Sequence, residues 1–128
     1  MFKKSSPKSL GDAGEELALA YLQKQGLKLV ERNYRVAAGP SRHAGEVDLV
    51  LRDRDGTLVF AEVRARRGDS HGGAAASVTA AKQRRISYAA QHYLLQRFAT
   101  LPACRFDVIA VEGGQIEWIR AAFDLSAP

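Results

Sequence analysis

Hydrophobic and polar residues alternate along two neighbouring stretches in the middle of the chain, residues 45–51 and 57–64. Alternation with a period of two is typical of strands that bury one face. Asp55 and Gly56, which lie between the two stretches, favour a tight turn. The pattern therefore predicts an antiparallel hairpin, and the length of its turn decides which side chains face one another.

The register of this hairpin follows from the distribution of charge. A two-residue loop would set Asp48 opposite Val63 and place charge on the apolar face. A three-residue loop, with Gly56 in the left-handed conformation, pairs Val47 with Val63 and Leu49 with Ala61, and these residues keep one face wholly apolar. We therefore expect the three-residue loop.

In that register the polar face sets Asp48 directly opposite Glu62, and Glu46 opposite Arg64. Two carboxylates at cross-strand distance repel each other, so protonation, a basic partner or a cation has to compensate. A hard divalent cation with oxygen ligands, Mg2+ above all, meets this need. The alternative is a half-solvated hairpin whose charged face simply meets water.

Helical and strand periodicity predict the other elements. Ser9 as a cap and Gly26 as a stop delimit a first helix, and Thr79 caps a second. Strands are predicted at residues 27–36 before the hairpin, and at 105–111 and 115–120 after the second helix. That helix connects the third and fourth strands and makes them parallel. The fold class is therefore α/β, a mixed sheet with helices packed on it, in the order α-β-β-β-α-β-β.

The buried stripes of both helices carry charged residues at their edges. The first stripe consists of Gly14, Leu17, Ala18, Tyr21 and Leu22. Glu15 lies at its edge, where an acid in the first turn complements the helix dipole. Lys82 lies one turn before Ile86 on the stripe of the second helix, near the hairpin acids.

Composition adds bounds to this fold. The 128 residues, 46% of them hydrophobic, suit a basic N-terminal arm at 1–9 and one domain at 10–125. A net charge of +5 suits a polyanion such as nucleic acid and is also common in proteins that bind none. A single cysteine, Cys104, and the lack of an apolar segment of membrane-spanning length predict a cytoplasmic protein with no membrane partner.

Six segments of the chain, in this order, resemble the YraN family of endonuclease-like bacterial proteins. They are Gly11 to Glu15, Glu31 to Tyr34, Gly45 to Leu49, Phe60 to Arg64, Val78 with Lys82 to Arg85, and Arg105 to Val108. The resemblance runs from about Leu10 to Phe123. That family is similar to archaeal Holliday junction resolvases and belongs with the PD-(D/E)XK nuclease superfamily. The resemblance implies a restriction-endonuclease-like core.

The resemblance also implies roles for particular residues. Asp48 and Glu62 match the two motif acids, and Glu15 matches a helix acid that serves as a further metal ligand, for Mg2+ or Mn2+. Arg64 stands where the superfamily motif has Lys. Lys82 and Gln83 match a polar position on the following helix.

Basic residues around the acid pair would contact phosphates and so bind nucleic acid without reading its base sequence. They are Arg66, Arg67, Lys82, Arg84 and Arg85. The expected function is hydrolysis of phosphodiester bonds in structured or branched DNA by a metal-dependent endonuclease. A symmetric junction would suit a homodimer. The alternatives are a catalytically inactive nucleic-acid-binding domain of the same fold and a small interaction protein whose basic face is incidental.

Overall fold

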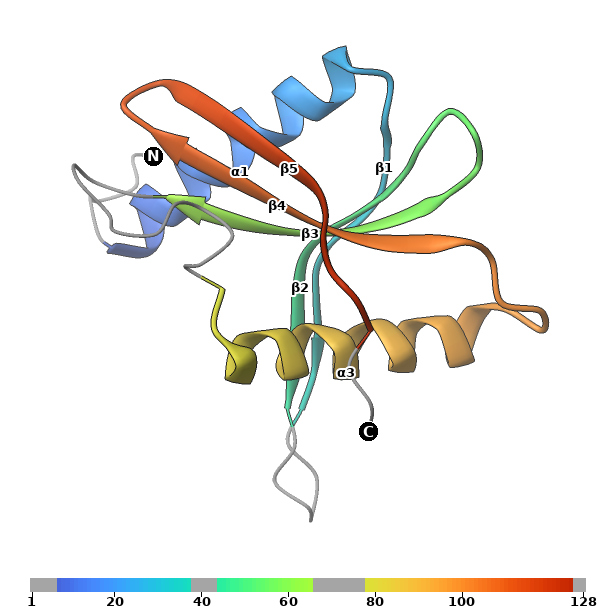
Figure 1. Cartoon of the computed structure of the whole chain (residues 1–128). Helices are drawn as coiled ribbons and strands as arrows, with labels where there is room; N and C mark the ends of the chain where they lie inside the picture. The colour runs from blue at the N-terminus through green and yellow to red at the C-terminus, as the bar shows by residue number, and fades with distance from the viewer. Residues whose placement is uncertain (1–6, 38–43, 66–77, 126–128) are drawn as a thin grey trace, which may run out of the picture.

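The computed structural model describes residues 7–37, 44–65 and 78–125 (Figure 1). Strands β1 to β5 form one sheet in chain order, in which β3 and β4 are parallel and the other neighbours antiparallel. This confirms the predicted mixed α/β class and the order of its elements. The elements are α1 (Pro7–Lys24), β1 (Lys28–Val36), β2 (Gly45–Arg52), β3 (Leu58–Ala65), α3 (Ala80–Arg97), β4 (Cys104–Glu112) and β5 (Gln115–Phe123).

The two helices cover opposite faces of the sheet (Figure 1). Leu58 and Phe60 of β3 belong to a buried cluster under α3, whereas Val59 and Ala61 belong to one under α1. Side chains of a strand alternate between faces, so β3 is buried on both sides. Within the described part of the chain, no helix is long and apolar enough to cross a membrane.

The β2–β3 hairpin has the predicted register. Leu49 pairs with Ala61 and Arg52 with Leu58. The turn is closed by a hydrogen bond of 3.0 Å from the Gly56 N–H to the Asp53 carbonyl, and Gly56 has φ +90°. A positive φ is accessible to glycine at little cost. The three-residue turn is therefore confirmed.

The two strands of the hairpin separate beyond the Leu49–Ala61 pair. β2 continues to Gly45 along β1, while β3 continues along β4. Gly45 lies so close to α3 that a Cβ there would be 2.7 Å from the Ala89 nitrogen. Val47 packs into the cluster under α3, so the expectation that it would extend the apolar face of Leu49 is wrong.

The second helix begins as predicted, and the first differs in detail. The Lys82 N–H donates to the Thr79 hydroxyl at 3.2 Å, which confirms the cap. Leu17 is 49% exposed and Leu19 is buried, so the predicted stripe of α1 is wrong at Leu17. Helix α1 begins at Pro7, within the stretch predicted as an arm. Residues 1–6 of that arm lie outside the described residues.

A buried carboxylate links the last two strands to the hairpin turn. Asp107 of β4 is fully buried and accepts hydrogen bonds from Trp118 Nε1 and the Ala121 N–H, both at 2.9 Å, and from Arg105 Nε at 3.1 Å. Arg105 Nη1 lies 2.9 Å from Asp53 in the turn. The pairing of β4 with β5 is irregular beside Asp107, and Ala121, whose N–H donates to that carboxylate, has a φ of +50°. Strand β5 ends three residues beyond its predicted end.

Asp107→Asn tests this network. Loss of the charge removes the buried carboxylate beside Arg105 and leaves Asp53 as its ion-pair partner among the described residues. Removing one member of a buried ion pair costs about 3–5 kcal/mol. We expect urea unfolding to show a loss of about that size. Asp124→Asn, at an exposed position, is the matched control, and equal stabilities of the two variants would contradict this account.

Candidate functional site

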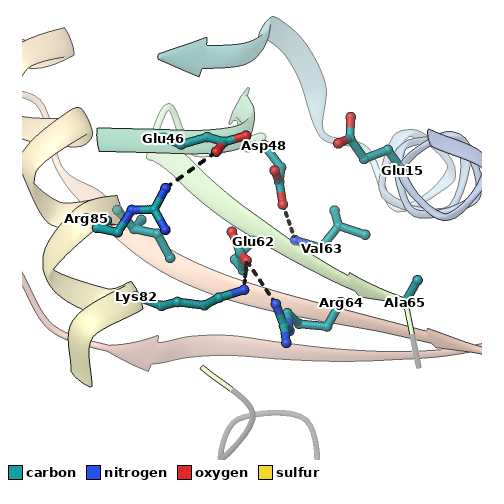
Figure 2. Close-up of a pocket in the computed structure, with 10 residues that line it drawn as sticks. Glu15, Glu46, Asp48, Glu62, Val63, Arg64, Ala65, Lys82 and Arg85 are labelled. Carbon is teal, nitrogen blue, oxygen red and sulfur yellow. Dashed lines mark hydrogen bonds and ion pairs between the residues drawn. The ribbon is translucent and has the colours of Figure 1, made fainter. Parts of the chain in front are cut away.

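A cleft of about 250 Å³ lies where β2 and β3 separate. It is bounded by α1, by the diverging strands and by the first turns of α3 (Figure 2). Among the described residues, the charged side chains that line it are of both signs: four carboxylates, Glu15, Glu46, Asp48 and Glu62, and three cations, Arg64, Lys82 and Arg85.

The side chain of Asp48 connects β2 to β3 beyond the point where the backbone pairing of these strands ends. Its Oδ2 accepts a hydrogen bond from the Val63 N–H at 2.8 Å (Figure 2). This N–H lies two residues past Ala61, the last residue of β3 that pairs with β2. Among the described residues, Asp48 is the cleft carboxylate that has no cation within ion-pair distance.

The acid pair has raised pKa values. Burial raises the pKa of Asp48 to about 7, and repulsion by Glu62 adds to the rise, while the bond from Val63 opposes it. Burial also raises the pKa of Glu62, against the opposing effects of a hydrogen bond with Asp48 and of the charges of Lys82 and Arg64. The predicted repulsion between these two carboxylates is therefore present in the structure.

Two cations compensate Glu62 from different elements. Arg64 Nη1 lies 3.7 Å and Lys82 Nζ 3.9 Å from Glu62 Oε2 (Figure 2). The Nε atom of Arg64 is buried and has no hydrogen-bond partner among the described residues. A buried donor without a partner is costly, so an incoming acceptor at this position would gain an unused hydrogen bond.

The expected cross-strand contact between Glu46 and Arg64 is wrong. Because the strands have separated at this level, Arg64 pairs with Glu62 on its own strand. Glu46 instead lies 3.4 Å from Arg35 Nε on β1 and 3.9 Å from Arg85 Nη2 on α3.

Glu15 reaches the cleft from α1. A Cβ on Gly14 would lie 3.3 Å from the Ala65 Cβ, so the helix approaches β3 closely and Glu15 points toward Asp48 (Figure 2). Its side chain is 14% exposed, and its Oε1 lies 3.7 Å from Arg32 Nη2.

Only some of the other residues predicted for the site line the cleft. Lys82 and Arg85 line the cleft, whereas Gln83 and Arg84 are not among its lining residues. The Gln83 amide donates to the Val78 carbonyl at 3.1 Å, in the segment that precedes α3. Arg66 and Arg67 lie outside the described residues.

Sequence reasoning missed Arg32 and Arg35, the two β1 residues that pair with cleft carboxylates. The strand predicted at residues 27–36 gives a signal that could have found Arg35, because a strand that precedes a hairpin commonly pairs with the first strand of the hairpin. Arg35 lies directly opposite Glu46 in that pairing.

The oxygen donors of the cleft fit a hard divalent cation by their chemistry. Asp48, Glu62 and Glu15 are carboxylates, and the Val63 carbonyl belongs to the same segment of β3. Mg2+ prefers such oxygen ligands. In the described part of the chain, no three acidic, histidine or cysteine side chains form a group that could hold a metal ion as they stand. Ligation would therefore require side-chain movement within the cleft.

Comparison with known proteins places the chain in a family. Residues 14–111 match the model described as "Uncharacterised protein family UPF0102". The chain belongs to the UPF0102 family. UPF0102 proteins of Methylibium petroleiphilum and Paracidovorax citrulli are 67% identical over 119 residues and 55% identical over 122 residues, respectively. These matches cover 93% and 95% of this chain, and 97% and 87% of the relatives. The part that matches the UPF0102 model includes every residue that lines the cleft.

The raised pKa of Asp48 predicts a pH dependence of stability without metal. A raised pKa means that the folded chain binds this proton more tightly than the unfolded chain does. The resulting stability is complete below the ordinary pKa of 3.8 and is lost as the pH rises to about 7. At 1.36 kcal/mol per pKa unit, the loss amounts to at most about 4 kcal/mol.

Urea unfolding in chelator at a series of pH values would measure this loss. Asp48→Asn should remove much of it and make the chain more stable than the parent above pH 7. Glu31→Gln, a change to an acid outside the cleft, is the control. An Asp48→Asn variant that is less stable than the parent at high pH would contradict the assignment.

Proposed function

We propose that this UPF0102 protein is a metal-dependent endonuclease that hydrolyses phosphodiester bonds in structured or branched DNA. One observation carries the proposal: two partly buried carboxylates with raised pKa values, Asp48 and Glu62, share a cleft. Such a pair requires positive charge or protons. Perturbed carboxylates in a cleft are also typical of functional sites.

Phosphodiester hydrolysis requires a neutralised phosphate, an activated water and a stabilised leaving group. A divalent ion bound by Asp48, Glu62 and Glu15 would polarise the phosphate and lower the pKa of a bound water. Arg64 would hold a phosphate oxygen, since its guanidinium presents several donors in a fixed plane. Arg64 keeps its proton at any relevant pH, so a carboxylate or a substrate oxygen has to accept the proton of the water.

Lys82 adds positive charge on the other side of Glu62. It lies in the first turn of α3, where the helix dipole also favours an anion. Together, Lys82 and Arg64 would stabilise the charge that develops on the phosphate in the transition state. In the structure both lie within ion-pair distance of Glu62.

Sequence resemblance supports the choice of reaction and of substrate. The segments that carry Glu15, Asp48, Glu62 and Arg64 resemble the YraN family, which is similar to Holliday junction resolvases. The resemblance implies a restriction-endonuclease-like core, and the described helices and strands follow the order that the sequence predicts for this chain. The net charge of +5 suits a nucleic-acid substrate, and a symmetric junction would suit two copies of the chain.

Arg64 favours a second candidate, a nucleic-acid-binding domain of the same fold without catalysis. The superfamily motif has Lys at this position, and Lys can exchange a proton where Arg cannot. This candidate predicts binding to DNA without cleavage.

Incubation with linear, flapped and four-way DNA, in Mg2+ and in Mn2+, tests the proposed reaction. We expect cleavage of the branched forms by the parent and none by Asp48→Ala. In parallel, calorimetry should show Mn2+ binding that Asp48→Ala and Glu62→Gln abolish and Glu15→Gln weakens. Binding of DNA without cleavage in either ion would favour the second candidate, and unchanged Mn2+ binding in Asp48→Ala would exclude this metal site.

Substitution of Arg64 separates its roles. If it holds a phosphate, Arg64→Lys should lower the cleavage rate about tenfold or more, because the planar fork is lost, and Arg64→Ala should lower it further. Single-turnover rates would measure both effects. Faster cleavage by Arg64→Lys would instead identify Arg64 as a replaced catalytic lysine.

A further inference from the structure

We propose that Arg35 and Arg85 form a phosphate-binding rim at the mouth of the cleft. In this proposal Glu46 occupies both arginines by ion pairing and thereby limits the affinity for nucleic acid. The inference rests on the proposed function, because it takes the ligand to be a nucleic-acid backbone. It gives Arg35 a role in binding and gives Glu46 a role other than catalysis or metal ligation.

Glu46, which lines the cleft, links β1 to α3; of its two partners Arg85 also lines the cleft, and Arg35 lies beside it on β1. Its Oε2 lies 3.4 Å from Arg35 Nε on β1, and its Oε1 lies 3.9 Å from Arg85 Nη2 on α3. Arg35 and Glu46 are also direct partners in the pairing of β1 with β2. Each carboxylate oxygen therefore faces one cation, and Figure 2 shows the contact with Arg85 at the edge of the cleft.

Both contacts are suited to exchange. Charge-assisted hydrogen bonds of full strength are about 2.7–2.9 Å long, and these two distances are longer. The side chains of Arg35 and Arg85 are 63% and 55% exposed, and exposed ion pairs contribute little to stability. A polyanion can therefore replace Glu46 as the partner of both cations at a small cost.

Phosphate has the acceptor chemistry that would make this replacement. An arginine side chain can bind two phosphate oxygens at once, and a backbone that crosses the mouth of the cleft beside Glu46 carries phosphates toward both arginines. Glu46 would then face those phosphates without a partner. Its repulsion would weaken every nucleic acid that enters the cleft, and fewer counterions would be released on binding.

The chain contains a matched control for this arrangement. Glu31 of β1 lies 3.1 Å from Arg97 of α3, and it also links β1 to α3. The side chains of Glu31 and Glu46 are both 35% exposed. Neither Glu31 nor Arg97 lines the cleft. Glu31→Gln therefore makes the same change in charge and releases an arginine in the same way, at a different place.

Fluorescence anisotropy with a labelled four-way DNA, in chelator and over a series of salt concentrations, tests the proposal without any cleavage. We expect Glu46→Gln to bind about three- to tenfold more tightly than the parent at low salt. Its log–log salt slope should be steeper by about one. Glu31→Gln should bind like the parent.

A double-mutant cycle tests the rim itself. Arg35→Gln should weaken binding only slightly in the parent, where Glu46 already neutralises that cation, and more strongly in the Glu46→Gln background. The same should hold for Arg85→Gln. Equal losses in both backgrounds would overturn the proposal.

The remaining outcomes separate this inference from the proposed function. If the parent binds DNA and Glu46→Gln has the same affinity and salt slope, the proposed effect of Glu46 on the two arginines is wrong and the proposed function stands. An equal gain in Glu31→Gln would reduce the effect to net charge and would also overturn it. If neither the parent nor Glu46→Gln binds at low salt, both proposals fail.

Discussion

The hydrogen bond from the Val63 N–H to the Asp48 carboxylate organises the candidate site. It lies where β2 and β3 stop pairing, and it satisfies a backbone donor that the separated strand no longer satisfies. A carboxylate in this position is partly buried beside Glu62 and has a raised pKa. The separation of the two strands therefore creates the cleft and places Asp48 beside Glu62 within it.

Most carboxylates of the cleft have at least one cation within ion-pair distance. Glu62 faces Arg64 and Lys82, Glu46 faces Arg35 and Arg85, and Glu15 faces Arg32. Among the described residues, Asp48 has no such cation, and its pKa is raised to about 7. Binding of a divalent ion by the acids would release cations that a phosphate could then use. In this arrangement, the ion and the phosphate would each favour the binding of the other.

The fold could be predicted from sequence wherever local patterns decide it. The turn at Gly56 and the apolar alternation fixed the pairing of Leu49 with Ala61, and Thr79 marked the start of α3. The acid pair followed from that register. These features depend on neighbours in the sequence, which a pattern records directly.

The failures came from tertiary constraints. The pairing of Glu46 with Arg64 assumed that the hairpin continues, but β2 leaves β3 to approach α3, and Val47 turns with it. Leu17 has the right periodicity but lies on the exposed side of α1, where Leu19 takes its place in the core. The roles of Arg32 and Arg35 depend on contacts between elements, which periodicity does not encode.

Nuclear magnetic resonance with Mn2+ tests the central claim most directly, because a bound paramagnetic ion broadens the signals of nearby amides. The account predicts that the Val63 amide and its neighbours on β3 broaden first and saturably, and that Asp48→Asn abolishes this effect while leaving the rest of the spectrum unchanged. Uniform broadening across the surface, or saturable broadening that persists in Asp48→Asn, would contradict it.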